Sequence, residues 1–372
     1  MQSPNIAYNP RLDHLRFFAA FIVLMFHTNA WYMGVAGRDR FRLPILDQGY
    51  TGVGLFMVIS GMILTLITYE REIDTKRFYL NRLLRIYPLF VVVVTLGYFS
   101  TPDPRETSAG IDYLMALLPI SNLYRFKYGA YGGAMFSVMI EMQFYLMFPI
   151  LALMLRQRGV RFYLALIGFL LLLRAIVFAL NGTVHHLGYF SIFGALDLFL
   201  IGCLAGVYYA RTEEKRISGM WWLVAVVVIN VVIFFMHRPS GLFHVNYRQG
   251  SSVSSSVLWV VWPTLQGLMW AGLVLAYLKG SFALPFSKVW AYLGKISYSL
   301  YAWHTIACML AVAYIAPLLG SSYLTGLVVV LPSAVAVSAL SYYLVESPFL
   351  ALRTRYVKAD APEGPAGARI AA

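Results

Sequence analysis

Apolar runs of about twenty residues recur along almost the whole chain, separated by short polar gaps. A run of this length forms a helix of about 30 Å, which is enough to cross the hydrocarbon core of a bilayer. The pattern therefore indicates an all-α fold, a polytopic transmembrane helix bundle of about ten helices. Their approximate ranges are 15–33, 50–69, 83–100, 134–155, 162–180, 189–209, 221–236, 257–278, 296–318 and 323–345.

The polar gaps predict the orientation of these spans. Lys and Arg are more frequent in the gaps on the side of the N-terminus, so we expect both termini to be cytoplasmic. The first run lacks a clear small-residue cleavage site, and we expect it to remain as the first helix. We expect a transmembrane domain over 1–350 and a cytoplasmic, disordered tail over 351–372, because the tail's end lacks apolar periodicity.

Composition narrows the class of protein. The 372 residues are 60% hydrophobic and 12% charged, whereas a soluble domain usually carries about a quarter charged residues. The net charge of +13 does not indicate nucleic acid, because the basic residues lie mainly in the gaps that orient membrane helices. Cys203 and Cys308 lie in apolar runs without metal-binding or redox spacing, so no metal site is predicted.

The first polar cluster lies in the run RLDHLRFFAAFIVLMFHTNAW. Arg16 and His27 fall roughly 20° apart around a helix and about 16 Å apart along it. A histidine at membrane depth needs a polar partner, and we predict that His27 takes the proton from an attacking hydroxyl. The alternative is a plain hydrogen bond to another helix. Asp13 either pairs with Arg16 or caps the helix.

A second cluster, FYLNRLLRIYP, places Arg82 and Arg85 on one helix face. Two guanidinium groups at the cytoplasmic end of a span suit the phosphates of coenzyme A. The alternative is that they contact lipid phosphates and determine topology.

In a third cluster, FSVMIEMQFYLMFP, Ser137, Glu141 and Tyr145 share one helix face. A carboxylate so placed must find a partner, which is either a substrate sugar or an arginine of another helix. We include all three residues among the predicted substrate-binding groups.

Two further segments contain candidate site residues. In GKISYSLYAWHT, Ser297, Tyr301 and His304 share one face, and His304 is the rival candidate for the base. In LVESPF, Glu346 precedes Pro348, which predicts the end of the last helix near the cytoplasmic boundary.

Together these segments resemble the integral-membrane acyltransferase family 3, which comprises polysaccharide and peptidoglycan O-acetyltransferases. The resemblance rests on Arg16 with His27, on the pair Arg82-x-x-Arg85, and on GYTGVGLFMVISGMILT. It covers about residues 12–349. The chain departs from the family pattern where a Trp usually precedes Ser and Leu, because here Phe136 stands in that place.

The resemblance implies that His27 and Glu346 are catalytic, and that Arg16, Arg82 and Arg85 support donor binding. It predicts transfer of an acyl group from acyl-CoA, without a bound cofactor, to a polysaccharide or lipid-linked glycan at the plasma membrane of a bacterium. Membrane lipid is the other expected partner. Some relatives add an esterase-like domain after the bundle, whereas about 26 residues follow here, so we expect action alone or with a partner. The rivals are a flippase for an anionic lipid-linked glycan, and a subunit without chemistry.

Overall fold

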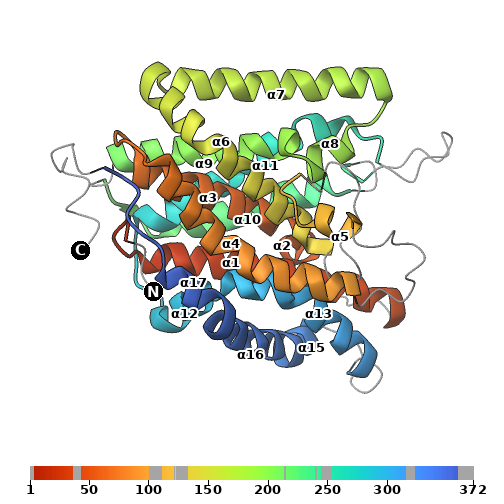
Figure 1. The fold of residues 1–372 in the computed structure, drawn as a ribbon. Coiled ribbons are helices and arrows are strands. Elements are labelled where there is room, and N and C mark those ends of the chain that lie inside the picture. The colour runs from red at the N-terminus through yellow and green to blue at the C-terminus, as the bar shows by residue number, and fades with distance from the viewer. Residues whose placement is uncertain are drawn as a thin grey trace. The chain divides into compact units, whose positions relative to one another are not determined.

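Helices account for nearly all regular structure in the computed structural model (Figure 1). It describes residues 4–36, 43–99, 111–120, 122, 133–212, 215–238, 241–243, 254–315 and 323–358. The chain forms two compact units. Unit 1 comprises Met1–Val53, Asp74–Tyr145 and Phe286–Tyr356, and unit 2 comprises Gly54–Ile73, Leu146–Pro285 and Val357–Ala372.

Unit 1 is built around α1 (Pro10–Ala36), which packs against α12 (Ser287–Lys295) and α13 (Ser297–Tyr314). Figure 1 shows α1 and α13 side by side, although they are far apart in the sequence. The other long helices of this unit are α4 (Thr75–Phe99) and the first part of α6 (Phe136–Arg158). Its short elements are α2 (Pro44–Asp47), η1 (Gly49–Thr51), α5 (Ile111–Ala116) and η4 (Gly133–Met135).

The last helical stretch of unit 1 contains two π-helical turns. It runs through α15 (Tyr323–Thr325), η7 (Gly326–Val330), α16 (Leu331–Ser341), η8 (Tyr342–Glu346) and α17 (Ser347–Ala351), and both η7 and η8 are π-helical turns. Pro348 lies in the first turn of α17, where its missing N–H is tolerated. The prediction that Pro348 stops the last helix is therefore wrong, since the helix continues to Ala351.

Two glycines permit the close packing around α1. A Cβ atom at Gly49 would lie 1.9 Å from the carbonyl oxygen of Ile22, and one at Gly294 would lie 1.9 Å from the carbonyl oxygen of Asp13. Both distances are far below van der Waals contact. Glycine is thus required at each point where η1 and α12 meet the backbone of α1.

Unit 2 contains most of α3 (Gly52–Thr68) and the rest of α6, together with α7 (Val160–Asn181) and α9 (Ile192–Arg211). It also holds α8 (His185–Phe190), α10 (Met220–Met236), η6 (Val257–Val260) and α11 (Trp262–Lys279). Two short parallel strands, β1 (Ile217–Ser218) and β2 (Gly280–Ser281), pair with each other. Helix α9 is buried along most of its length and packs against α7, α8 and α11.

A fully buried ion pair and its hydrogen bonds join four helical elements of unit 2, namely α7, α9, α11 and η6. The guanidinium of Arg174 in α7 donates to the carboxylate of Asp197 in α9 at 2.8 Å and to the hydroxyl of Thr264 in α11 at 2.9 Å. Its Nε donates to the carbonyl of Val260 at 2.8 Å. The bridge satisfies a charge that would be costly in an apolar surrounding.

The chain is an all-α, polytopic membrane protein. Within the described ranges, six helices are long and apolar enough to cross a membrane, namely Gly49–Thr68, Thr75–Phe99, Phe136–Arg158, Val160–Asn181, Ile192–Arg211 and Gly326–Ala351. The total of ten spans and the cytoplasmic position of the termini stay predictions. The outer gaps and the expected tail lie partly outside the described residues.

One helix begins well before its expected span. We predicted a span over 83–100, but α4 starts at Thr75, so Arg82 and Arg85 lie inside the helix. Asp74 explains the early start, because its carboxylate accepts a hydrogen bond from the N–H of Arg77 at 3.1 Å and caps the first turn.

Candidate functional site

A pair of histidines lies between α1 and α13 in unit 1. Nε2 of His304 is 3.2 Å from Nδ1 of His27, and the rings are 4.7 Å apart between centroids. His304 is 1% exposed. The structure thus brings together the predicted base and its predicted rival.

Backbone carbonyls assign the protons on these two rings. Nδ1 of His27 is 2.9 Å from the carbonyl oxygen of Val23, and Nδ1 of His304 lies against the carbonyl oxygen of Tyr301. A carbonyl only accepts, so both Nδ1 atoms carry a hydrogen. Nε2 of His304 then accepts from Nδ1–H of His27, and Nε2 of His27 carries the lone pair of its ring. This is the tautomer that a general base requires.

Tyr301 extends the polar stripe of α13 towards α6. Its hydroxyl lies 2.6 Å from that of Ser137 and donates to the carbonyl of Ala134 at 2.9 Å. On the same face of α6, the hydroxyl of Tyr145 donates to the carboxylate of Glu141 at 2.5 Å. Both predicted polar faces thus lie on helices, α6 and α13.

Arg82 lies among three aromatic rings rather than beside a carboxylate. Its guanidinium carbon is 5.6 Å from the ring centroid of Phe78, 5.4 Å from that of Tyr145 and 5.8 Å from that of Tyr356. Its Nε is buried without a hydrogen-bond partner in the part of the chain that the structure describes. Cation–π attraction holds the charge there while leaving guanidinium donors for an anion.

Arg85 faces the two carboxylates that the sequence singled out. It interacts electrostatically with Glu346 and more weakly with Glu141. Glu346 is 1% exposed and accepts a hydrogen bond from Ser299, and its Oε2 has no hydrogen-bond partner among the described residues. Glu346 therefore lies within electrostatic range of Arg85.

Asp13 and Arg16 form the expected ion pair at 2.7 Å in the first turns of α1. The carboxylate is mostly buried, whereas the Arg16 side chain is 29% exposed. Arg16 is therefore oriented by Asp13, about 16 Å along the helix from His27.

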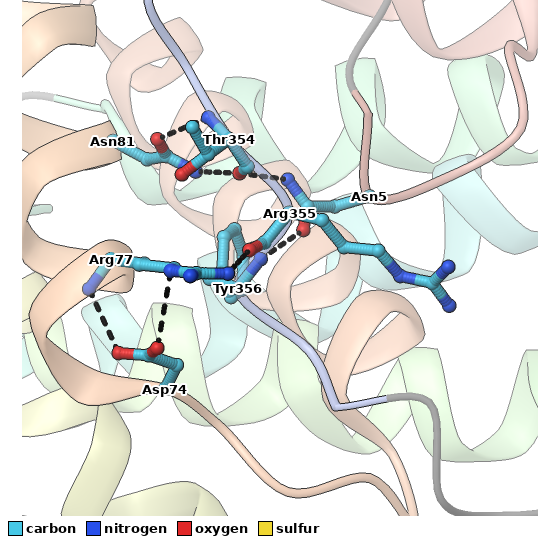
Figure 2. Close-up of polar contacts among 7 residues, drawn as sticks. All are labelled: Asn5, Asp74, Arg77, Asn81, Thr354, Arg355 and Tyr356. Atoms are coloured by element: carbon cyan, nitrogen blue, oxygen red, sulfur yellow. Dashed lines mark hydrogen bonds and ion pairs between the residues drawn. The ribbon is translucent and has the colours of Figure 1, made fainter.

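The segment after α17 contributes groups that the sequence analysis missed (Figure 2). The side-chain amide of Asn81 donates to the carbonyl of Thr354 at 2.6 Å and accepts from its N–H at 3.0 Å. Asn5 donates to the same carbonyl at 3.3 Å and accepts from the N–H of Tyr356 at 2.9 Å. The carbonyl of Tyr356 accepts from the N–H of Asp74. We call this set of bonds around residues 354–356 the asparagine clasp.

One signal could have revealed the clasp in advance. Asn81 is a buried amide next to Arg82, in a helix whose other buried residues are mainly apolar. A buried amide requires partners, but the sequence does not show that these are backbone groups about 270 residues later. The sequence instead predicts a disordered tail over 351–372, of which the structure describes residues 351–358.

Comparisons with known proteins identify the family of the chain. A family described as an acyltransferase domain matches residues 9–343. The chain is 27% identical to O-acetyltransferase OatA of Staphylococcus aureus (strain NCTC 8325 / PS 47) over 330 residues, covering 82% of this chain and 51% of that protein. It is 24% identical to the protein named "Putative O-acetyltransferase SAS0844" of strain MSSA476, covering 92% of this chain and 57% of that protein.

The chain thus spans about half the length of the curated relatives it matches. No solved structure was found to match it.

Proposed function

Because the chain belongs to the integral-membrane acyltransferase family 3, we propose that it is a membrane O-acyltransferase. It transfers an acyl group from acyl-CoA to a hydroxyl of a cell-surface polysaccharide or lipid-linked envelope glycan. The acyl group that we propose is acetyl. The reaction takes place at the plasma membrane of a bacterium. The names of the two relatives support O-acetyl transfer.

The observation that carries this proposal is the orientation of His27 by Val23 and His304. Nε2 of His27 accepts the proton of the acceptor hydroxyl as its oxygen attacks the thioester carbonyl. The C–S bond of the tetrahedral intermediate then breaks, and the imidazolium returns the proton to the leaving thiolate. The products are an ester and free coenzyme A, and no external oxidant or reductant is needed.

The arginines support the donor end of the same reaction. Arg82 and Arg85 bind the phosphates of acyl-CoA, and the acyl thioester extends towards the histidine pair. Ser299, beside Glu346, and His304 are five residues apart on α13, a separation of about 7.5 Å along the helix. The flexible arm of acyl-CoA that carries the thioester extends from the level of Ser299 to that of His304.

The test is release of free thiol from acetyl-CoA by the purified protein in the presence of envelope glycan. His27→Ala is expected to lower kcat by about two to four orders of magnitude, the usual contribution of a general base. His186→Ala is a suitable control, because His186 is exposed on α8 in unit 2. All three proteins are first compared for insertion and thermal stability.

Equal rates for wild type and His27→Ala would remove His27 from the mechanism. If the wild type moved a lipid-linked glycan across vesicles without releasing thiol from any donor, the flippase alternative would replace the transferase.

A further inference from the structure

Arg353 lies on the segment that follows α17, next to the residues held by the asparagine clasp. Its Nε donates to the carbonyl of Leu350 at 3.2 Å, which bends the side chain back along the end of the helix. The backbone N–H and carbonyl groups of Thr354 and Tyr356 are all hydrogen-bonded. A segment fixed in this way holds the Cα of Arg353 in a defined place.

The position of Arg353 is next to the predicted donor-binding arginines. The ring of Tyr356 lies 5.8 Å from the guanidinium carbon of Arg82. Arg353 itself interacts electrostatically with Arg85, Arg82 and Arg16, in decreasing order. Burial, together with these positive charges, lowers the pKa of Arg353 to about 10, so it remains charged at neutral pH.

Among the described residues, one of these four arginines forms an ion pair with a carboxylate. Asp13 forms an ion pair with Arg16, but Arg82, Arg85 and Arg353 make no ion pair with a carboxylate in the described part of the chain. Glu346 and Glu141 lie within electrostatic range of Arg85. Like charges held together by packing disfavour the empty site, and a polyanion relieves that repulsion.

We propose that Arg353 is a further phosphate ligand, which completes with Arg82 and Arg85 a binding site for the phosphate groups of the acyl donor. The identity of the donor rests on the proposed function. The clasp residues Asn5 and Asn81 act as positioning residues, because both hydrogen-bond to the segment that carries Arg353.

The experiment compares Arg353→Gln with Arg355→Gln. Arg355 is exposed, and its backbone carbonyl accepts from Arg77 at 3.5 Å, so its side chain can be changed without removing this bond (Figure 2). Full-length proteins in zwitterionic nanodiscs are titrated with coenzyme A and, separately, with inorganic pyrophosphate. We expect Arg353→Gln to weaken both by about tenfold or more, the usual effect of losing a charged hydrogen bond, and Arg355→Gln to leave both unchanged.

A kinetic arm separates binding from chemistry. Arg353→Gln should raise the KM for acetyl-CoA and leave kcat at saturating donor near the wild-type value, because phosphate binding is the same in ground and transition states. Asn81→Asp, which loses the bond to the carbonyl of Thr354, should raise KM in the same direction. Equal affinities of Arg353→Gln and Arg355→Gln for both probes would overturn the inference.

The same experiments distinguish a failure of the anion site at Arg353 from a failure of the transferase function. If the wild type binds pyrophosphate through Arg353 but cleaves no thioester, the anion site stands and the transferase function falls. If acetyl transfer proceeds and Arg353→Gln leaves KM unchanged, the function stands and Arg353 is not a phosphate ligand.

Discussion

His27 and His304 carry the same ring but have different neighbours, and the neighbours determine their tasks. His304 is buried and accepts from the Nδ1–H of His27, while its own Nδ1–H donates to the carbonyl of Tyr301. Glu346 has Ser299 and Arg85 as neighbours. A catalytic role for Glu346 stays a prediction from family resemblance.

His304 is therefore expected to act as a positioning residue. His304→Ala removes one hydrogen bond to His27, worth about 1 kcal/mol, and should lower kcat by roughly fivefold to tenfold with little change in KM. His304→Gln offers a replacement acceptor and should recover part of the rate. Steady-state kinetics over pH 5 to 9 would check both variants. A loss in His304→Ala as large as that in His27→Ala would make His304 the base.

At the scale of single elements, close helix packing in unit 1 depends on glycines. Gly294→Ala places a methyl group against the backbone of α1 at Asp13, so helix α12 must shift. We expect a loss of about 1 to 3 kcal/mol of stability, typical of overpacking. Gly272→Ala in α11 is the control, because its Cβ meets open space, and it should be neutral or gain up to about 1 kcal/mol.

Thermal unfolding of both glycine variants in the same detergent measures this difference. Equal stabilities would mean that α12 accommodates the methyl group by moving without cost, contrary to the packing described here.

Elements were predictable where periodicity is strong, and less so where side chains define their ends. The runs behind α3, α7 and α10 have nearly the predicted bounds. The start of α4 depends on the cap at Asp74, and the end of α17 depends on a π-helical turn before Pro348. Neither changes the hydropathy of the run.

At the site, spacing placed Asp13 with Arg16 and Glu141 with Tyr145, whereas the contact between His27 and His304 depends on tertiary packing.

At the scale of the whole molecule, membrane topology determines whether the proposed donor, acyl-CoA, reaches the arginines from the cytoplasm. The described free cysteines are both buried, so an introduced cysteine can report on its own side of the membrane. With both termini cytoplasmic, Asn181 at the end of α7 faces outwards and Lys358 inwards.

A membrane-impermeant maleimide applied to intact cells should label Asn181→Cys and leave Lys358→Cys unlabelled until the cells are opened. Labelling in the reverse pattern would invert the topology and place the arginine cluster away from the donor.

The buried bridge of Arg174 has a consequence for how the chain is made. Asp197 is synthesised 23 residues after Arg174, and Thr264 is synthesised 90 residues after Arg174. At about 5 to 20 residues per second, the arginine waits roughly 5 to 20 seconds for its last partner. Until Asp197 is made, roughly 1 to 5 seconds after Arg174 at the same rate, α7 must remain in the bilayer without its ion pair, against about 2.5 to 3.5 kcal/mol for a central arginine. Its seven leucines offset about 2 to 4 kcal/mol, which makes the helix self-sufficient until the bridge closes.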